Sequence, residues 1–380
     1  MPISRRNLLS KLVATAVTGA AVQALGDLSL ANASTAPRMS STTGPIFLCS
    51  NENAYGPSEK VLAAMREASS GGNRYPRTEY DSLLNKIAAL HRVRPEQIVL
   101  GCGSSEVLRI AAAAFLGPGK RLVQASPTFP LPGEFAQSVG AEVISVPLNK
   151  MHEHDLEAML ARVDASIGLV YICNPNNPTG TLTARKDIET FVSKLPAKTI
   201  VLIDEAYHHF AGGSSSYASF LDHPLDDGRV MVVRTFSKIY GLAGMRVGYA
   251  VATPEIALRL SKDRLRLGVS VISAKAAAAA LDDSQYVLTA AKRNANDRQE
   301  FMNQVNARML RALDSQTNFV MLDPLRPVDQ VLGHLKQNNI LVAPPIPAMN
   351  KYICVSLGTP AEMLEFWRVW DLMPPQKMAM

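Results

Sequence analysis

Cysteine is scarce in this sequence. Its 4 cysteines among 380 residues are Cys49, Cys102, Cys173 and Cys354. No two are spaced as CxxC, and no cysteine and histidine stand at the spacing of a zinc site. The nearest approach to a metal motif, residues 152–154 (HEH), lacks the i, i+4 spacing of two helical ligands. The sequence therefore indicates no metal site, and we expect the HEH segment to lie on a solvated face or in a loop.

Long runs of one charge are also absent. The formal net charge is +6 at pH 7, but the lysines and arginines are scattered along the chain. A nucleic-acid-binding surface usually carries clustered basic residues. We therefore expect no nucleic-acid partner. With 47% hydrophobic and 19% charged residues, the chain can bury a large globular core.

The N-terminal apolar stretch, residues 12–25, is too short to span a bilayer comfortably. It follows the pair Arg5-Arg6 and precedes residues 31–33 (ANA), which gives the order basic, apolar, small-x-small. This order resembles a bacterial twin-arginine export signal cleaved after Ala33. The alternative is an amphipathic or disordered arm. We expect residues 1–33 to direct the protein to the periplasm or outside the cell, with no membrane association after cleavage.

From residue 34 onward, short β-branched runs alternate with longer runs of helical spacing. This alternation is typical of an α/β fold, a mostly parallel sheet between two layers of helices. We expect buried strands over residues 97–100, 168–173, 199–203 and 230–234. Helical spacing predicts helices over residues 104–115 and 184–195.

The pattern changes beyond about residue 270. A long helical stretch over residues 292–313 is followed by short strands near 318–322 and 352–357 and by a terminal helix. This predicts a smaller α+β domain. We expect an N-terminal arm with part of the small domain over 34–70, a large cofactor-binding domain over 71–270, and a C-terminal small domain over 271–380.

Ligands of open α/β sheets collect at the carboxyl ends of strands, so the residues after each predicted strand are candidates for a site. Residues 101–106 (GCGSSE) form a glycine turn that opens a helix, whose free N–H groups suit a phosphate. A tight turn with a serine N-cap is the alternative. The third glycine of a dinucleotide-binding GxGxxG motif is missing, which argues against a nicotinamide-dependent dehydrogenase.

Two further strand ends carry polar side chains. Residues 174–180 (NPNNPTG) hold an amide in a proline-fixed turn, although such a segment can also be an ordinary turn. Asp204 directly follows an apolar run, and a buried carboxylate needs a cationic partner. A pyridinium nitrogen would be such a partner, and helix N-capping is the alternative role for Asp204.

The fourth segment contains Lys238, which is flanked by small and apolar residues with no carboxylate beside it. A lysine in such a setting can lose its proton and attack an aldehyde. Ser237 and Arg246 supply the hydroxyl and guanidinium groups that a cofactor phosphate requires. A single lysine is usually a surface residue, so this hypothesis depends on the combination.

Together these segments resemble the fold-type I pyridoxal-phosphate enzymes, and most closely the histidinol-phosphate aminotransferase-like branch of the class I/II aminotransferases. The resemblance covers roughly residues 45–372. Its motifs are residues 51–57 (NENAYGP), 74–76 (RYP), Asn177-Pro178-x-Gly180, Asp204-x-x-Tyr207, and Ser237-Lys238 with Arg246. It implies pyridoxal 5'-phosphate as cofactor, with Lys238, Asp204 and Tyr207 as catalytic residues.

The resemblance also implies a role for each matching position. Lys238 would hold the cofactor as a Schiff base, and Asp204 would face the pyridine nitrogen. The ring hydroxyl would be contacted by Asn177 and Tyr207. The phosphate would be held by Ser104, Ser105, Ser237 and Arg246. Phe129 would stack on the ring. Tyr75 would reach the phosphate of a partner subunit, which implies a homodimer with shared active sites.

The sequence departs from this family near its C-terminus. Relatives carry an arginine that clamps the substrate's carboxylate or phosphate, in a strand that ends in Gly-Thr or Gly-Ser. Here Cys354 stands at that position, and Ala343 replaces a second arginine. A thiol cannot substitute for a bidentate guanidinium. Lys351 is a candidate for a compensating cation. We therefore expect histidinol phosphate to be a poor substrate.

The leading interpretation is an exported aminotransferase that moves an amino group between an amino acid or amine and a 2-oxo acid. The alternative is an enzyme with the same cofactor that catalyses racemisation, elimination or oxidation of an amino acid. A catalytically silent cofactor-binding regulator is a third class, but no helix-turn-helix segment precedes the cofactor-binding domain. Transfer of an amino group to a 2-oxo acid would separate the first interpretation from the others.

Overall fold

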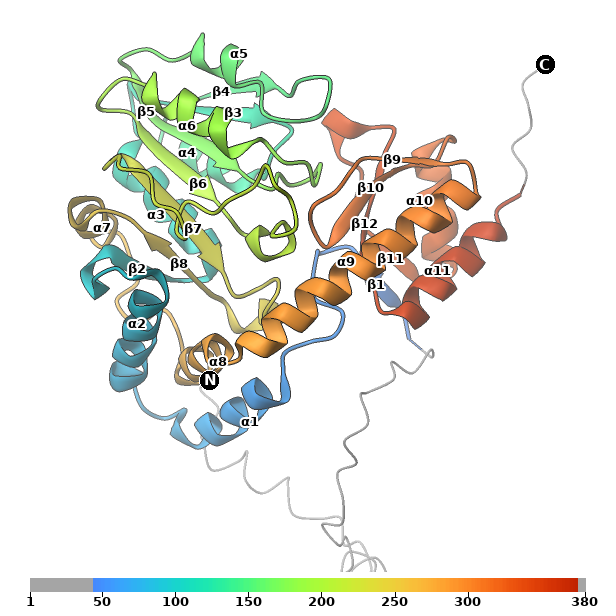
Figure 1. Ribbon diagram of the computed structural model, residues 1–380, viewed down its shortest axis with the longest axis horizontal. Helices are drawn as coiled ribbons and strands as arrows, with labels where there is room; N and C mark the ends of the chain where they lie inside the picture. Colours follow the sequence, from blue (N-terminus) through green and yellow to red (C-terminus); the bar gives the residue numbers. More distant parts are fainter. Residues whose placement is uncertain (1–43, 375–380) are drawn as a thin grey trace, which may run out of the picture. The chain divides into compact units, whose positions relative to one another are not determined.

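The computed structural model describes residues 44–374, so the predicted signal peptide lies outside the described residues. At the centre is a sheet of seven strands in the order β2-β8-β7-β6-β5-β3-β4. The strands are β2 (Ile98–Cys102), β3 (Arg121–Ser126), β4 (Glu142–Pro147), β5 (Ile167–Cys173), β6 (Ile200–Asp204), β7 (Val230–Thr235) and β8 (Val247–Val251). Only β8 runs antiparallel to its neighbours within this sheet. The predicted mostly parallel sheet is confirmed (Figure 1).

Helices cover both faces of this sheet. One face is covered by α3 (Gly103–Phe115), α4 (Leu131–Ser138) and α7 (Pro254–Leu260). The other is covered by α2 (Arg77–His91), α5 (Leu156–Leu160), α6 (Arg185–Ser193) and α8 (Val271–Leu281), and α1 (Glu59–Ala68) packs on α8. The period of two along β5 explains the layering, because Leu169 and Tyr171 face the first group and Val170 and Ile172 face the second.

A smaller α+β part follows. Its elements are α9 (Ser284–Ala307), β9 (Arg311–Ala312), β10 (Phe319–Asp323), α10 (Val328–Gln337), β11 (Ile340–Val342), β12 (Ile353–Ser356) and α11 (Pro360–Asp371). Strands β12, β10 and β9 form an antiparallel sheet. Strand β1 (Ile46–Leu48) pairs in parallel with β11, so the N-terminal arm joins this part. The aromatic side chains of α9 and α11 form its core.

One expectation about local structure was wrong and a second was right only in part. The long helix predicted over residues 292–313 begins earlier, where Asp283 caps the amide of Tyr286, and it ends at Ala307. Met309 then adopts a left-handed φ of 54°, which stops the helix before β9. His154 was expected on a solvated face or in a loop. It is in a loop but buried, with Nδ1 2.7 Å from Thr183 Oγ1, and burial lowers its pKa to about 4.

Three strands of the large sheet, β3, β4 and β8, were not predicted. Polar residues interrupt β3 (RLVQAS) and β4 (EVISVP), which weakens their apolar pattern. In the described part of the chain, no helix is long and apolar enough to cross a membrane.

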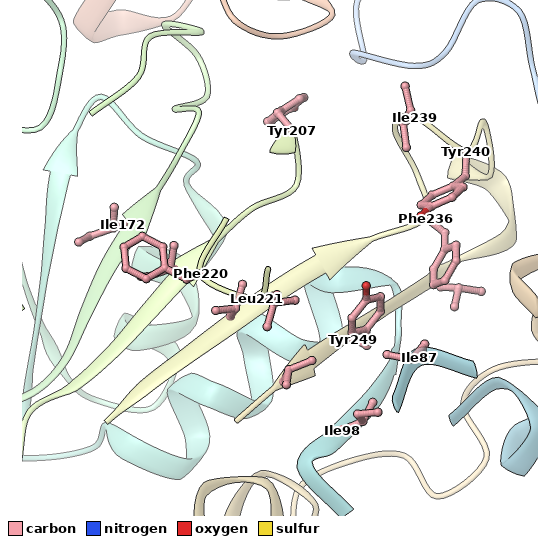
Figure 2. Packing of buried hydrophobic residues seen from close by; sticks show 14 of the residues in the cluster. Ile87, Ile98, Ile172, Tyr207, Phe220, Leu221, Phe236, Ile239, Tyr240 and Tyr249 are labelled. Carbon is pink, nitrogen blue, oxygen red and sulfur yellow. The ribbon is translucent and has the colours of Figure 1, made fainter. Parts of the chain in front are cut away.

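A buried ion pair connects the ends of two central strands. Arg234 of β7 donates through Nε to Oε2 of Glu205, which follows β6, at 2.8 Å. Ser219 also donates to this carboxylate at 2.8 Å, and both charged side chains are almost completely buried. Phe220, which follows Ser219, belongs to a large buried apolar cluster that also contains Phe236 and Tyr249 (Figure 2).

We predict that Arg234→Leu lowers the free energy of unfolding by about 3–5 kcal/mol, because it leaves the Glu205 carboxylate buried without a cation. Denaturant unfolding of the purified protein measures this change. Arg368→Leu is the control, because the Arg368–Glu365 pair lies on the surface, where we expect almost no shift in the unfolding midpoint. Equal midpoints for wild type and Arg234→Leu would contradict the prediction.

Candidate active site

A cavity of about 540 Å³ lies at the carboxyl ends of the central strands. It is lined by almost all of the predicted site residues, namely Ser104, Ser105, Phe129, Asn177, Asp204, Tyr207, Ser237, Lys238 and Arg246. These residues come from separate segments, each of which follows or precedes a strand of the large sheet. The parallel arrangement brings these strand ends to one edge. Tyr75 is the one predicted residue that does not line this cavity.

Lys238 lies in the cavity just after β7. Its Nζ donates to the backbone oxygens of Ser50 at 3.1 Å and Asn51 at 2.9 Å, and it lies 5.5 Å from the ring centroid of Tyr207. Burial lowers the pKa of Lys238 to about 8, and the positive charge of Arg246 adds to this lowering. A substantial neutral fraction therefore exists near neutral pH, which is the form that attacks a carbonyl.

Asp204 ends β6 and is 3% exposed. Its Oδ2 accepts a hydrogen bond from Tyr171 Oη at 3.0 Å, and its Oδ1 accepts one from the Ala206 amide at 3.1 Å. Burial nevertheless raises the pKa of Asp204 to about 6. Within the described residues this carboxylate has no salt-bridge partner. A cation placed against it would be strongly stabilised, because an unpaired buried charge is costly.

An anion-binding corner lies beside Lys238, where α3 begins. Gly103 starts the helix with a φ of 76°, and a β-carbon there would collide with the Arg246 guanidinium. The helix therefore brings its free N–H groups close to Arg246. Arg246 donates to the Ala243 oxygen at 2.9 Å but forms no ion pair with any described residue. Its charge is available to an anion at the helix N-terminus.

Asn177 and Tyr207 are joined by a hydrogen bond, in which Asn177 Nδ2 donates to Tyr207 Oη at 3.3 Å. Asn51 Nδ2 donates to the same oxygen at 3.2 Å. Asn51 thus contacts both Tyr207 and Lys238. The sequence analysis assigned it no role, although it lies in the NENAYGP motif. Tyr171 was missed as well, since its position inside an apolar strand carried no signal of a polar contact.

The cavity fits pyridoxal phosphate in three separate respects. The corner with Gly103 and Arg246 suits a phosphate, the buried Asp204 carboxylate suits a protonated pyridine nitrogen, and Lys238 can react with the aldehyde. No group of three or more His, Cys, Asp or Glu side chains within residues 44–374 is arranged to hold a metal ion.

Cys354, Ala343 and Ile346 also line the cavity, where the family's arginines are expected. Burial raises the pKa of the Cys354 thiol to about 12, so this side chain is neutral. Lys351, the candidate replacement, points its Nζ over the ring of Tyr352 at 5.9 Å and does not line the cavity. Among the described residues, Arg246 is the sole arginine in the lining.

Tyr75 is 76% exposed and lies at a separate surface cavity with Tyr80 and Arg264. Its expected role requires a second subunit, and that role stays a prediction.

Comparisons with known proteins identify the family of this chain. Residues 43–369 match the family described as aminotransferase class I and II. The chain is 37% identical over 321 residues to histidinol-phosphate aminotransferase 2 of Carboxydothermus hydrogenoformans, a match that covers 84% of this chain and 88% of that protein. It is 36% identical to histidinol-phosphate aminotransferase of Staphylococcus carnosus, with coverage of 85% and 90%. The fold is also similar to the crystal structure of histidinol-phosphate aminotransferase from Sinorhizobium meliloti in complex with pyridoxal-5'-phosphate. The TM-score is 0.80 at 29% identity, and the match covers 87% of this chain and 90% of that chain.

We predict that Lys238→Ala abolishes turnover and removes the covalent link to pyridoxal phosphate, while the fold and some non-covalent cofactor binding remain. Borohydride reduction followed by peptide mapping locates the link. Lys351→Ala is the matched control and should retain both the link and full activity, because its side chain lies outside the cavity. Normal activity in Lys238→Ala, or a cofactor mapped to another lysine, would show that the assignment is wrong.

Proposed function

We propose that this chain, which belongs to the class I and II aminotransferases, binds its amino donor without an arginine clamp. An anionic group on the donor, where the donor has one, is then not held by a guanidinium group. It is a pyridoxal-phosphate-dependent transaminase, which moves an amino group between an amino donor and a 2-oxo acid. The alternative reactions of the same cofactor are not favoured, because the named relatives are aminotransferases. The observation that carries this conclusion is the convergence of Lys238, Asp204 and Arg246 on one cavity.

When bound, pyridoxal phosphate supplies an electron sink that makes the carbon next to the donor's amine acidic. The protein's own residues support that chemistry. Asp204 holds a proton at a ring nitrogen placed against it, and Arg246 with the α3 N-terminus binds the phosphate. Lys238 Nζ acts as the nucleophile and, when free and neutral, as the base that accepts and returns a proton. Asn177 and Asn51 orient the hydroxyl of Tyr207.

The substrate side of the cavity supports a departure from the relatives' usual substrate. Cys354 and Ala343 are neutral and stand where charged clamps are expected, and Lys351 does not replace them. A charge-assisted hydrogen bond to an anion contributes about 1.5–3 kcal/mol. Loss of a bidentate clamp should therefore reduce kcat/KM for an anionic substrate by about a hundredfold or more.

We predict that wild-type enzyme turns over histidinol phosphate poorly, and that Cys354→Arg increases kcat/KM for simple α-amino acids or dicarboxylic amino acids. The assay is a panel of amino donors with a 2-oxo acid acceptor. Cys354→Ser is the matched control, because it keeps the size of the side chain and adds no charge. Efficient wild-type turnover of histidinol phosphate would contradict the proposal and would mean that other residues hold the phosphate.

A homodimer is part of this proposal. Tyr75 is a large and exposed aromatic side chain that follows Arg74 in the RYP motif. Packing against a second subunit would bury it and would bring its hydroxyl to the partner's phosphate-binding corner. A single mass in solution at twice that of the chain would support this assembly.

Export is also proposed, on the order of residues 1–33 in the sequence. We predict that replacing Arg5 and Arg6 together with lysine leaves the enzyme in the cytoplasm with its N-terminus intact, because the export machinery reads the arginine pair. Fractionation of cells that express wild type or the double variant measures the distribution. Equal amounts of processed protein outside the cytoplasm in both strains would rule out this route.

A further inference from the structure

Among the charged side chains that line the cavity, one has no role in the proposed function. They are Glu52, Asp204, Lys238 and Arg246. Three of them serve the cofactor in the proposed function. Glu52 remains, and its carboxylate has no hydrogen bond or ion pair within the described part of the chain. With the cofactor bound, Glu52 would therefore be the charged side chain of the described lining that has no assigned partner.

Hydrogen bonds from the small sheet hold Glu52 at this place. The amide of Asn51 donates to Ser356 Oγ of β12 at 2.8 Å. Asn318, which precedes β10, donates through Nδ2 to the backbone oxygens of Asn51 at 3.1 Å and Glu52 at 3.0 Å. Asn51 adopts a left-handed φ of 52°, which turns the chain into the cavity. The backbone of Glu52 is thus fixed, and only its side chain is free to move.

Glu52 also lies close to the reacting amine. The backbone oxygens of Ser50 and Asn51 accept hydrogen bonds from Lys238 Nζ. Burial lowers the pKa of Lys238, and the Glu52 carboxylate is the strongest of the nearby charges that oppose this lowering. A substrate that approaches Lys238 therefore enters the field of Glu52.

The rest of the substrate side offers nothing to an anion. Ala343, Ile346 and Cys354 are neutral and largely apolar. A donor with a carboxylate would place its charge in the field of Glu52 without a described cation to bind it. A donor with a second cationic group would instead pair with Glu52 and lay its carbon chain along the apolar residues.

We propose that Glu52 is a specificity-determining residue that selects amino donors with a second cationic group and no carboxylate, that is, diamines. This inference rests on the proposed function, because Glu52 acts on the donor of the same transamination. In this inference, Glu52 binds the donor's distal ammonium group, and Lys238 acts at the amine that is transferred.

The test uses three donors of similar length, cadaverine, pentylamine and lysine, with the full-length holoenzyme and a 2-oxo acid acceptor. Cadaverine differs from pentylamine by the second ammonium group and from lysine by the missing carboxylate. In wild type, kcat/KM for cadaverine should exceed that for each of the others by about tenfold, the effect of one charge pair worth about 1.4 kcal/mol. Glu52→Gln should reduce the ratio of kcat/KM for cadaverine to kcat/KM for pentylamine to about one, because any effect through the pKa of Lys238 acts on both donors alike.

The acceptor provides a readout of opposite sign. A 2-oxo acid brings a carboxylate into the same cavity, so Glu52→Gln should lower its KM while raising that of cadaverine. A general disturbance of the fold would impair both substrates. Glu59→Gln, on the exposed first turn of α1, is the matched control and should change neither KM.

Three outcomes would overturn the inference. These are an equal effect of Glu52→Gln on cadaverine and pentylamine, a wild-type preference for lysine over cadaverine, and an unchanged KM for the 2-oxo acid. Failure of the proposed function looks different, because the wild-type holoenzyme would then transfer no amino group from any donor to the acceptor.

Discussion

Asp204 is buried at the end of a central strand, and a buried carboxylate needs a positive charge beside it. The site is organised around this requirement. The protein supplies two neutral donors, Tyr171 Oη and the Ala206 amide, but no salt bridge within the described residues. Burial is the main cause that raises the pKa of Asp204 to about 6. A protonated pyridine nitrogen meets the requirement and is itself kept protonated in return. On the proposed function, Lys238 would then meet the aldehyde and Arg246 the phosphate of the same molecule.

The sequence could predict this part of the site because parallel strands place their carboxyl ends at one edge of the sheet. Asp204, Asn177 and Lys238 each follow a buried strand that the apolar pattern revealed. Their convergence follows from topology and needs no knowledge of side-chain packing. Asn51 could not be found in this way, because its contacts with Lys238 and Tyr207 depend on how the N-terminal arm folds back over the sheet.

Local patterns failed where tertiary contacts or backbone turns decide the outcome. His154 is buried beside Thr183, although its neighbours in sequence are polar. The left-handed turn at Met309 ends α9. The helical spacing of apolar residues in the sequence nevertheless continues beyond this turn. Strand β8 was missed because its glycine weakens the apolar signal. Gly248 is nevertheless required there, since a β-carbon would collide with the backbone of Ser104 where α3 begins.

The cofactor side and the substrate side of the cavity are built by different parts of the chain. Strand ends of the large sheet hold the cofactor groups, whereas Ala343, Ile346 and Cys354 belong to the small α+β part and Glu52 to the arm that it holds. A substitution in the small part can therefore change the substrate without disturbing Asp204 or Lys238. Position 354 is such a place, because the family resemblance implies an arginine there, whereas the Cys354 thiol that lines the cavity is neutral. On the proposed function, the net charge of that wall would set the specificity, because the described residues on the substrate side include the Glu52 carboxylate and no arginine.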